Sequence, residues 1–138
     1  MPIAYVAHLA EEWLGGFIEW TPEALGYEMS VERFVLINAA ALVTVVAGTF
    51  AAFRNPRLAW LTASFAALFG LNGMLHGLAT VGLGSGYSPG AISGLVLYVP
   101  LAAIVLRSCA ERLPKRTFTG AVVFGLVLHA LVPVLAFL

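Results

Sequence analysis

The chain has 138 residues, a formal net charge of zero, 61% hydrophobic residues and only 10% charged residues. Soluble domains carry roughly 25% charged residues, so this composition and the mean hydropathy of +0.96 exclude an ordinary soluble fold. They predict one integral membrane domain that contacts membrane lipids. No surplus of basic residues is present to attract a polyanion, so we expect no nucleic-acid partner.

The first apolar segment, Pro2 to Ile18, contains His8, Glu11 and Glu12. Ionisable groups in membrane-embedded segments are rare and usually face a bundle interior or a partner, so each one suggests a function. On a helix, His8 shares a face with Glu12 at i,i+4 or with Glu11 at i,i+3. This spacing suits metal ligands. The segment predicts a helix that either spans the bilayer or lies at its interface.

Four further segments are apolar and long. In chain order they are Phe34 to Phe53, Leu58 to Leu83, Ala91 to Leu106 and Thr117 to Leu138. Because roughly 20 helical residues cross the ~30 Å hydrocarbon core, three of these segments suffice by length, and the shorter third one suffices with its flanks. With the N-terminal helix, the sequence predicts an all-α transmembrane bundle of five helices, in a single domain over residues 1–138.

The basic residues are concentrated in two loops, residues 54–57 and 107–116, which hold six of the seven Lys and Arg residues. Two predicted spans separate these loops, so both lie on the same face of the membrane. By the positive-inside rule this face is cytoplasmic. We therefore expect a multi-pass protein of the cell membrane, a bacterial inner membrane, with its N-terminus in the cytoplasm and its C-terminus outside.

Seven polar side chains lie at a similar depth in different predicted helices. They are His8, Glu11, Glu12, Asn38, Asn72, His76 and His129. Counted at 1.5 Å per residue from the predicted outer helix ends, all lie between ~9 and ~16 Å deep. This shared depth favours one polar site, in which Asn38 and Asn72 support the other members. The alternative is a set of independent hydrogen bonds between helices.

Three histidines and two glutamates suit a divalent metal centre, with zinc as the first choice and His8, His76, His129 and Glu12 as the ligands. In the alternative arrangement Glu11 is the ligand, and the remaining glutamate takes a proton from water. We therefore expect Glu11 and Glu12 to be the catalytic residues of a metal-dependent hydrolase. Its substrate would be lipid-like or another membrane-borne small molecule, because such molecules can reach an intramembrane site laterally.

Two other functions fit the same residues. In a metal-free hydrolase, a glutamate activates water while His76, Asn72 and His129 stabilise an oxyanion. In a non-enzymatic binder or carrier, the site holds or passes a cation, a proton or a small ligand.

Small residues predict how the helix of His76 packs. Gly70, Gly73 and Gly77 line one of its sides and would let the backbone of another helix approach closely. The small size of the chain and its Gly-lined helices are also compatible with a homodimer.

The sequence His8-Leu9-Ala10-Glu11-Glu12, placed near the N-terminus of a small multi-span protein with a later histidine, resembles the HXXEE-domain family, which is named for this motif. The resemblance covers nearly the whole chain. It implies that His8, Glu11, Glu12 and a later histidine form the site, and it implies no particular reaction.

A looser likeness is to the CPBP-type intramembrane proteases, which share the order Glu-Glu, His, His. Gly16, Asn72 and Pro133 stand here where that group has Arg, Phe and Asn. We therefore use this second likeness as a chemical analogy only.

Overall fold

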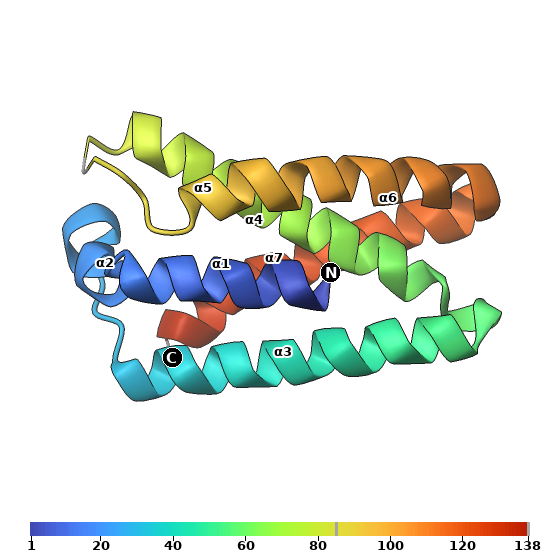
Figure 1. The fold of residues 1–138 in the computed structure, drawn as a ribbon, viewed down its shortest axis with the longest axis horizontal. Helices are drawn as coiled ribbons and strands as arrows, with labels where there is room; N and C mark the ends of the chain where they lie inside the picture. Colours follow the sequence, from blue (N-terminus) through green and yellow to red (C-terminus); the bar gives the residue numbers. More distant parts are fainter. Residues whose placement is uncertain (85, 138) are drawn as a thin grey trace.

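The computed structural model describes residues 1–84 and 86–137, and the regular structure of these residues is entirely helical (Figure 1). Four long helices form the bundle. They are α3 (Val31–Arg54), α4 (Trp60–Gly82), a continuous helix over residues 91–112, and α7 (Lys115–Phe137). A short turn, η1 (Pro56–Leu58), precedes α4.

The continuous helix over residues 91–112 has three parts, and we call it the α5–α6 helix. It begins with α5 (Ala91–Ser93), continues through a π-helical stretch, η2 (Gly94–Tyr98), and ends with α6 (Val99–Arg112). A π-helical turn inside an α-helix is rare and is frequent at functional sites.

All four long helices are long and apolar enough to cross a membrane, which confirms the four predicted spans. Only the last predicted residue, Leu138, lies outside the described residues. Large apolar side chains on the outward faces, such as Leu36, Val43 and Ile104, are exposed. Extensive exposed apolar surface is unusual for a soluble monomer and is what contact with lipid tails requires.

The N-terminal segment differs from the prediction. It forms two short helices, α1 (Pro2–Leu14) and α2 (Phe17–Leu25). Gly16 separates them with a φ of 75°, a left-handed conformation that favours glycine and interrupts the helix. The 13 residues of α1 extend only ~20 Å, which is short of the ~30 Å core. The prediction of five helices was therefore wrong: the described residues form six, of which four have spanning length.

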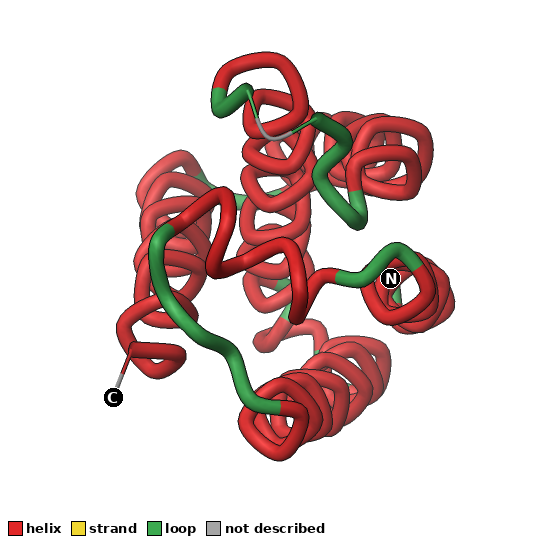
Figure 2. The backbone as a smooth tube through the Cα atoms, turned by 90° about the vertical axis from the view of Figure 1, so that its left-hand side faces the viewer, coloured by secondary structure: helices red, strands yellow, loops and turns green. Residues whose placement is uncertain are grey.

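Although it is short, α1 packs against the side of the bundle, between α3 and the beginning of the α5–α6 helix (Figures 1 and 2). Tyr5 is part of the hydrophobic core together with Phe69 and Tyr98. The Tyr5 ring stacks on Phe69 with 5.5 Å between ring centroids. Its hydroxyl donates a hydrogen bond to Asn38 Oδ1 at 2.8 Å. This contact ties α1 to α3 and orients the face of α1 that carries His8 and Glu12.

Glycines bring α4 and the α5–α6 helix to backbone contact, as the sequence predicted. A Cβ atom on Gly73 would lie 2.4 Å from the carbonyl oxygen of Gly94, and Cβ atoms on Gly70 and Gly77 would lie 2.9 Å from side chains of the same neighbouring helix. Such distances are shorter than van der Waals contact. The backbone of α4 can therefore approach this helix only because these positions have no side chain.

The two ends of the bundle differ in charge. The loops over residues 54–57 and 107–116, with six basic residues, lie together at one end. The opposite end holds α2, which carries the acidic residues Glu19 and Glu23, and the turn over residues 86–90 (Figure 1). This arrangement agrees with the predicted pairing of the loops. Which end faces the cytoplasm stays a prediction.

The first testable prediction concerns the contact between Gly73 of α4 and Gly94 of the α5–α6 helix. We expect Gly73→Ala to lower the free energy of unfolding by about 1–3 kcal/mol, because the new methyl group overlaps the backbone of Gly94. Gly82→Ala is the matched control on the same helix, since its Cβ would meet nothing within 4 Å. The measurement is the loss of helicity during titration of the detergent-solubilised protein with a denaturing detergent. Equal midpoints for the two variants would contradict the described packing.

Candidate metal centre

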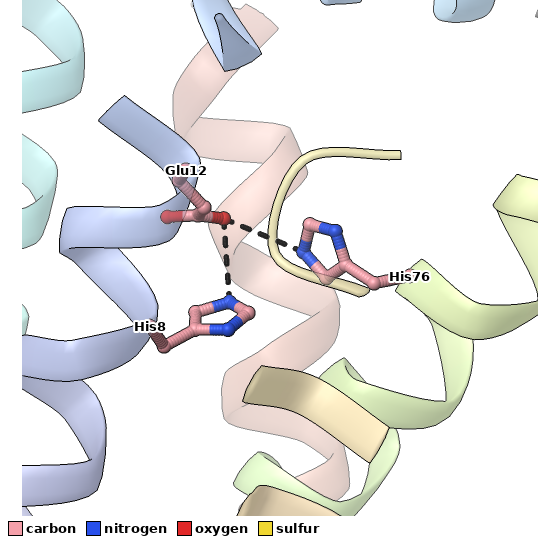
Figure 3. Close-up of side chains that lie close together, drawn as sticks. All are labelled: His8, Glu12 and His76. Carbon is pink, nitrogen blue, oxygen red and sulfur yellow. Dashed lines mark ion pairs between the residues drawn. The ribbon is translucent and has the colours of Figure 1, made fainter. Parts of the chain in front are cut away.

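Three ionisable side chains meet in the interior, and we call them the histidine–glutamate cluster. His8 and Glu12 lie one turn apart on α1, and His76 comes from α4 (Figure 3). Glu12 Oε1 lies 3.4 Å from His8 Nε2 and 3.4 Å from His76 Nε2. The residues are only 2%, 6% and 9% exposed for His8, Glu12 and His76, respectively. The cluster is therefore shielded from the surroundings, and its polar atoms must find their partners inside the protein.

In each imidazole, the ring nitrogen that faces away from Glu12 is within hydrogen-bonding distance of a serine hydroxyl. His8 Nδ1 lies 2.9 Å from Ser93 Oγ, and His76 Nδ1 lies 3.1 Å from Ser88 Oγ. Hydrogen bonds of this kind fix the orientation and tautomer of metal-binding histidines. Both rings consequently present Nε2 to the same oxygen of Glu12.

Ser93 Oγ lies 2.9 Å from His8 Nδ1 and also 3.4 Å from the carbonyl oxygen of Gly90, to which the hydroxyl can donate its single hydrogen. In that arrangement the oxygen accepts the Nδ1–H of His8, and Nε2 of the neutral ring presents a lone pair to the cluster. This buried Nε2 makes no hydrogen bond within the described residues. A metal ion or a proton between Nε2 and the Glu12 carboxylate would satisfy both atoms.

Gly90 forms one wall of the cluster. It adopts a φ of 96°, which strongly favours glycine. A Cβ atom at this position would lie 2.7 Å from His8 Cε1, 3.1 Å from His76 Nδ1 and 3.2 Å from Glu12 Cγ. The backbone of the turn therefore touches all three members of the cluster, and there is no room for a side chain.

The donor set and its spacing fit a divalent metal ion. One ligand atom from each residue can be chosen so that all three lie within 4.8 Å of one another. Two atoms that are each ~2.1 Å from a zinc ion, at the tetrahedral angle, are ~3.4 Å apart. Both nitrogen–oxygen distances in the cluster have this value. Two histidines and one glutamate are also a known ligand set of catalytic zinc sites, in which a fourth position stays open.

Glu11, a predicted catalytic residue, has a different environment from Glu12. Its carboxylate accepts hydrogen bonds from the backbone N–H of Ile92 at 2.9 Å and of Ser93 at 2.6 Å. The Tyr87 hydroxyl donates a third hydrogen bond. Burial and the hydrogen bond to this carboxylate raise the pKa of Tyr87 to about 12, so Tyr87 stays a donor at neutral pH. Glu11 thus binds the beginning of the α5–α6 helix and is not part of the cluster.

The structure also places His129 apart from the predicted site. His129 Nε2 lies 3.4 Å from Asn72 Nδ2, in the contact between α7 and α4. Asn38, on α3, binds Tyr5 and the carbonyl oxygen of Phe34. The group found among the described residues that could hold a metal ion therefore contains two of the three predicted histidines, without His129.

Four residues around the cluster were not identified from the sequence. Ser88 and Gly90 lie in the turn between the predicted spans Leu58 to Leu83 and Ala91 to Leu106. Ser93 lies just after this turn. Tyr98 lies in the π-helical stretch, and its ring centroid is 4.5 Å from that of His8. A serine in or beside a glycine-rich turn is not part of a helical or strand periodicity. The sequence therefore does not indicate which side chain it contacts. The only available signal was the shortness of the turn, which keeps it near the C-terminal end of the His76 helix.

Residues 1–105 match the family described as "Protein of unknown function with HXXEE motif". The matched part runs from α1 into α6 and contains the whole histidine–glutamate cluster and the turn that covers it. Neither a curated protein nor a solved structure gives a significant match to the chain.

The second testable prediction concerns Gly90. We expect Gly90→Ala to displace both histidines of the cluster, because its Cβ would overlap His8 and press on His76. Gly84→Ala is the control: Gly84 also has a positive φ, of 69°, but its Cβ would contact nothing within 4 Å. NMR of protein with labelled histidine rings measures the effect. The His8 and His76 signals should change in Gly90→Ala alone, and the same spectrum for both variants would contradict the described wall.

Proposed function

Because the chain belongs to the HXXEE family, with all the residues that form its cluster inside the matched region, we propose that it is a metal-binding integral membrane protein. Its ligands are His8, Glu12 and His76, and zinc is the ion that this ligand set suits best. The observation that carries the proposal is the meeting of one carboxylate oxygen and two imidazole nitrogens at 3.4 Å, in the buried interior.

The fixed residues of the motif have separate tasks in this proposal. His8 and Glu12 are ligands from one helical face, since they are one turn apart. Glu11 points to the neighbouring helix. The third ligand, His76, lies outside the motif on α4 and is oriented by Ser88. The bound ion would satisfy the carboxylate oxygen and both imidazole nitrogens and would link α1 to α4.

The activity that we propose is hydrolysis of a lipid-like or other membrane-borne substrate. Three protein ligands leave one coordination position of a tetrahedral zinc ion free. A zinc ion held by these three ligands would supply Lewis acidity for hydrolysis. An apolar hollow lined by Met74, Gly77, Leu78 and Leu95 adjoins His76 in the chain. An apolar part of a membrane-borne molecule could lie in this hollow.

A metal-holding protein without turnover is the second candidate, and the burial of all three ligands favours it. Two polar side chains in the basic half of the bundle are bonded within their own helices and do not extend the site. Thr44 and Ser64 donate their hydroxyl hydrogens to carbonyl oxygens of their own helices. This arrangement supports a closed site that retains its ion over one that passes ions across the membrane.

The third testable prediction is the metal content of the purified protein. We expect the wild type, exposed to zinc and then dialysed, to retain a stoichiometric amount. His8→Ala, His76→Ala and Glu12→Ala should each weaken binding by more than ~100-fold, because removal of a ligand costs more than loss of an outer contact. His129→Ala is the matched control and should retain the metal, since His129 binds Asn72 instead. Mass spectrometry of the eluted metal gives the stoichiometry.

Two results would contradict this assignment. A wild-type protein without metal under every loading condition would favour a metal-free cluster. Loss of zinc in His129→Ala, with folding intact, would restore the ligand set of four residues that the sequence suggested.

The fourth testable prediction separates the two candidates. In proteoliposomes that contain a fluorogenic medium-chain ester, the hydrolase should show zinc-dependent turnover that His76→Ala abolishes and His129→Ala preserves. Neither candidate predicts transport, so no zinc or proton flux should follow an imposed gradient. Bound zinc without turnover would favour the metal-holding protein, and a flux that depends on His76 would contradict both.

A further inference from the structure

We infer that Glu11 is a positioning residue: it attaches the beginning of the α5–α6 helix to α1 and so places the serines that orient the histidines. This inference deepens the proposed function. The inference rests on that function only for the predicted effect on metal affinity. The contact itself is visible without any metal.

The geometry around Glu11 is that of a helix cap supplied from another helix. The first N–H groups of a helix have no partners within the helix, and they carry partial positive charge. Here the N–H groups of Ile92 and Ser93, in the first turn of the α5–α6 helix, both donate to the Glu11 carboxylate. Because the hydrogen bonds join residues more than 80 positions apart in the chain, they fix two helices relative to each other.

Ser93 connects this cap to the cluster. Its backbone N–H is held by Glu11, and its side-chain oxygen holds His8 Nδ1. His8 and Glu11 lie three residues apart on the same side of α1, so two hydrogen bonds join this side of α1 to residue 93. A shift of the α5–α6 helix would therefore alter the orientation of the His8 ring.

The same cap fixes the turn that covers the cluster. Tyr87 binds the Glu11 carboxylate from the beginning of the segment, and Ile92 and Ser93 bind it from the end. Ser88 and Gly90, which contact His76 and all members of the cluster, lie between these attachment points. Loss of the carboxylate would free both ends of the segment at once.

The alternative function of Glu11, a general base that acts beside the metal, does not agree with these contacts. Both of its oxygens accept hydrogen bonds from donors outside the cluster. A base would need at least one oxygen directed at the cluster. Glu12 has that orientation and Glu11 does not.

The fifth testable prediction uses Glu11→Gln, which preserves the size of the side chain but removes its charge and one acceptor. Without metal, we expect amide hydrogen exchange at Ile92 and Ser93 to accelerate by about 10-fold or more, because one of the two hydrogen bonds loses its acceptor and the other is no longer made to a charged group. The Nδ1 signal of His8 should shift as well. The controls are Glu19→Gln, which removes an exposed carboxylate from the same end, and His129→Ala.

Two further measurements distinguish positioning from ligation and from general stability. Metal affinity should decrease by about 10- to 100-fold in Glu11→Gln, as expected for residues that orient ligands. At saturating Co²⁺, the visible spectrum of this variant should equal that of the wild type, whereas Glu12→Gln should change it. If Glu11→Gln fails to fold, Tyr87→Phe removes only one of the three donors and should show a smaller acceleration at the same amides.

Unchanged exchange at Ile92 and Ser93 together with an unchanged His8 signal in Glu11→Gln would overturn the inference. A Co²⁺ spectrum altered as strongly as in Glu12→Gln would also overturn it, because Glu11 would then be a ligand. A wild-type protein that binds no metal would contradict the proposed function alone, since the exchange and His8 measurements test the contact of Glu11 without metal.

Discussion

The structure depends on one constraint: three polar side-chain atoms, from His8, Glu12 and His76, face one another inside an apolar bundle. Buried polar groups without partners are costly, and a buried carboxylate is costlier still. Within the protein, serines satisfy the far nitrogens of both rings and leave the near ones directed at Glu12. A cation at the point where they meet would satisfy all three. The fold around the cluster supports this arrangement.

The short helix α1 is held by polar contacts on several sides, which explains how a helix too short to span the membrane has a fixed orientation. Tyr5 joins it to Asn38 on α3, His8 and Glu11 join it to Ser93, and Glu12 reaches His76 on α4. Close backbone contact at Gly73 and Gly90 brings α4 and the covering turn near enough for these bonds to form. Packing by small residues and polar contacts thus cooperate, as expected where lipid gives no hydrophobic drive between helices.

The sequence was sufficient for the four spans and the family, because length, hydropathy and a short motif are local properties. Depth says nothing about direction around a helix axis, so His129 seemed to belong with His76 although it faces Asn72. Adjacent glutamates point about 100° apart on a helix, but which neighbour each one meets depends on packing. The hydrogen bonds of Ser88 and Ser93 depend on the path of the turn, which has no periodic pattern. The break at Gly15 and Gly16 had a local signal, and the interpretation of one helix over Pro2 to Ile18 passed over it.

The most direct test of the central claim is a crystal structure of the zinc-loaded protein in lipid, with anomalous diffraction data collected on both sides of the zinc absorption edge. The account predicts one strong anomalous peak about 2.0–2.2 Å from His8 Nε2, His76 Nε2 and a carboxylate oxygen of Glu12, with Glu11 still bound to the N–H groups of Ile92 and Ser93. Absence of a peak among these three residues, or a peak that has His129 or Glu11 as a ligand, would contradict it.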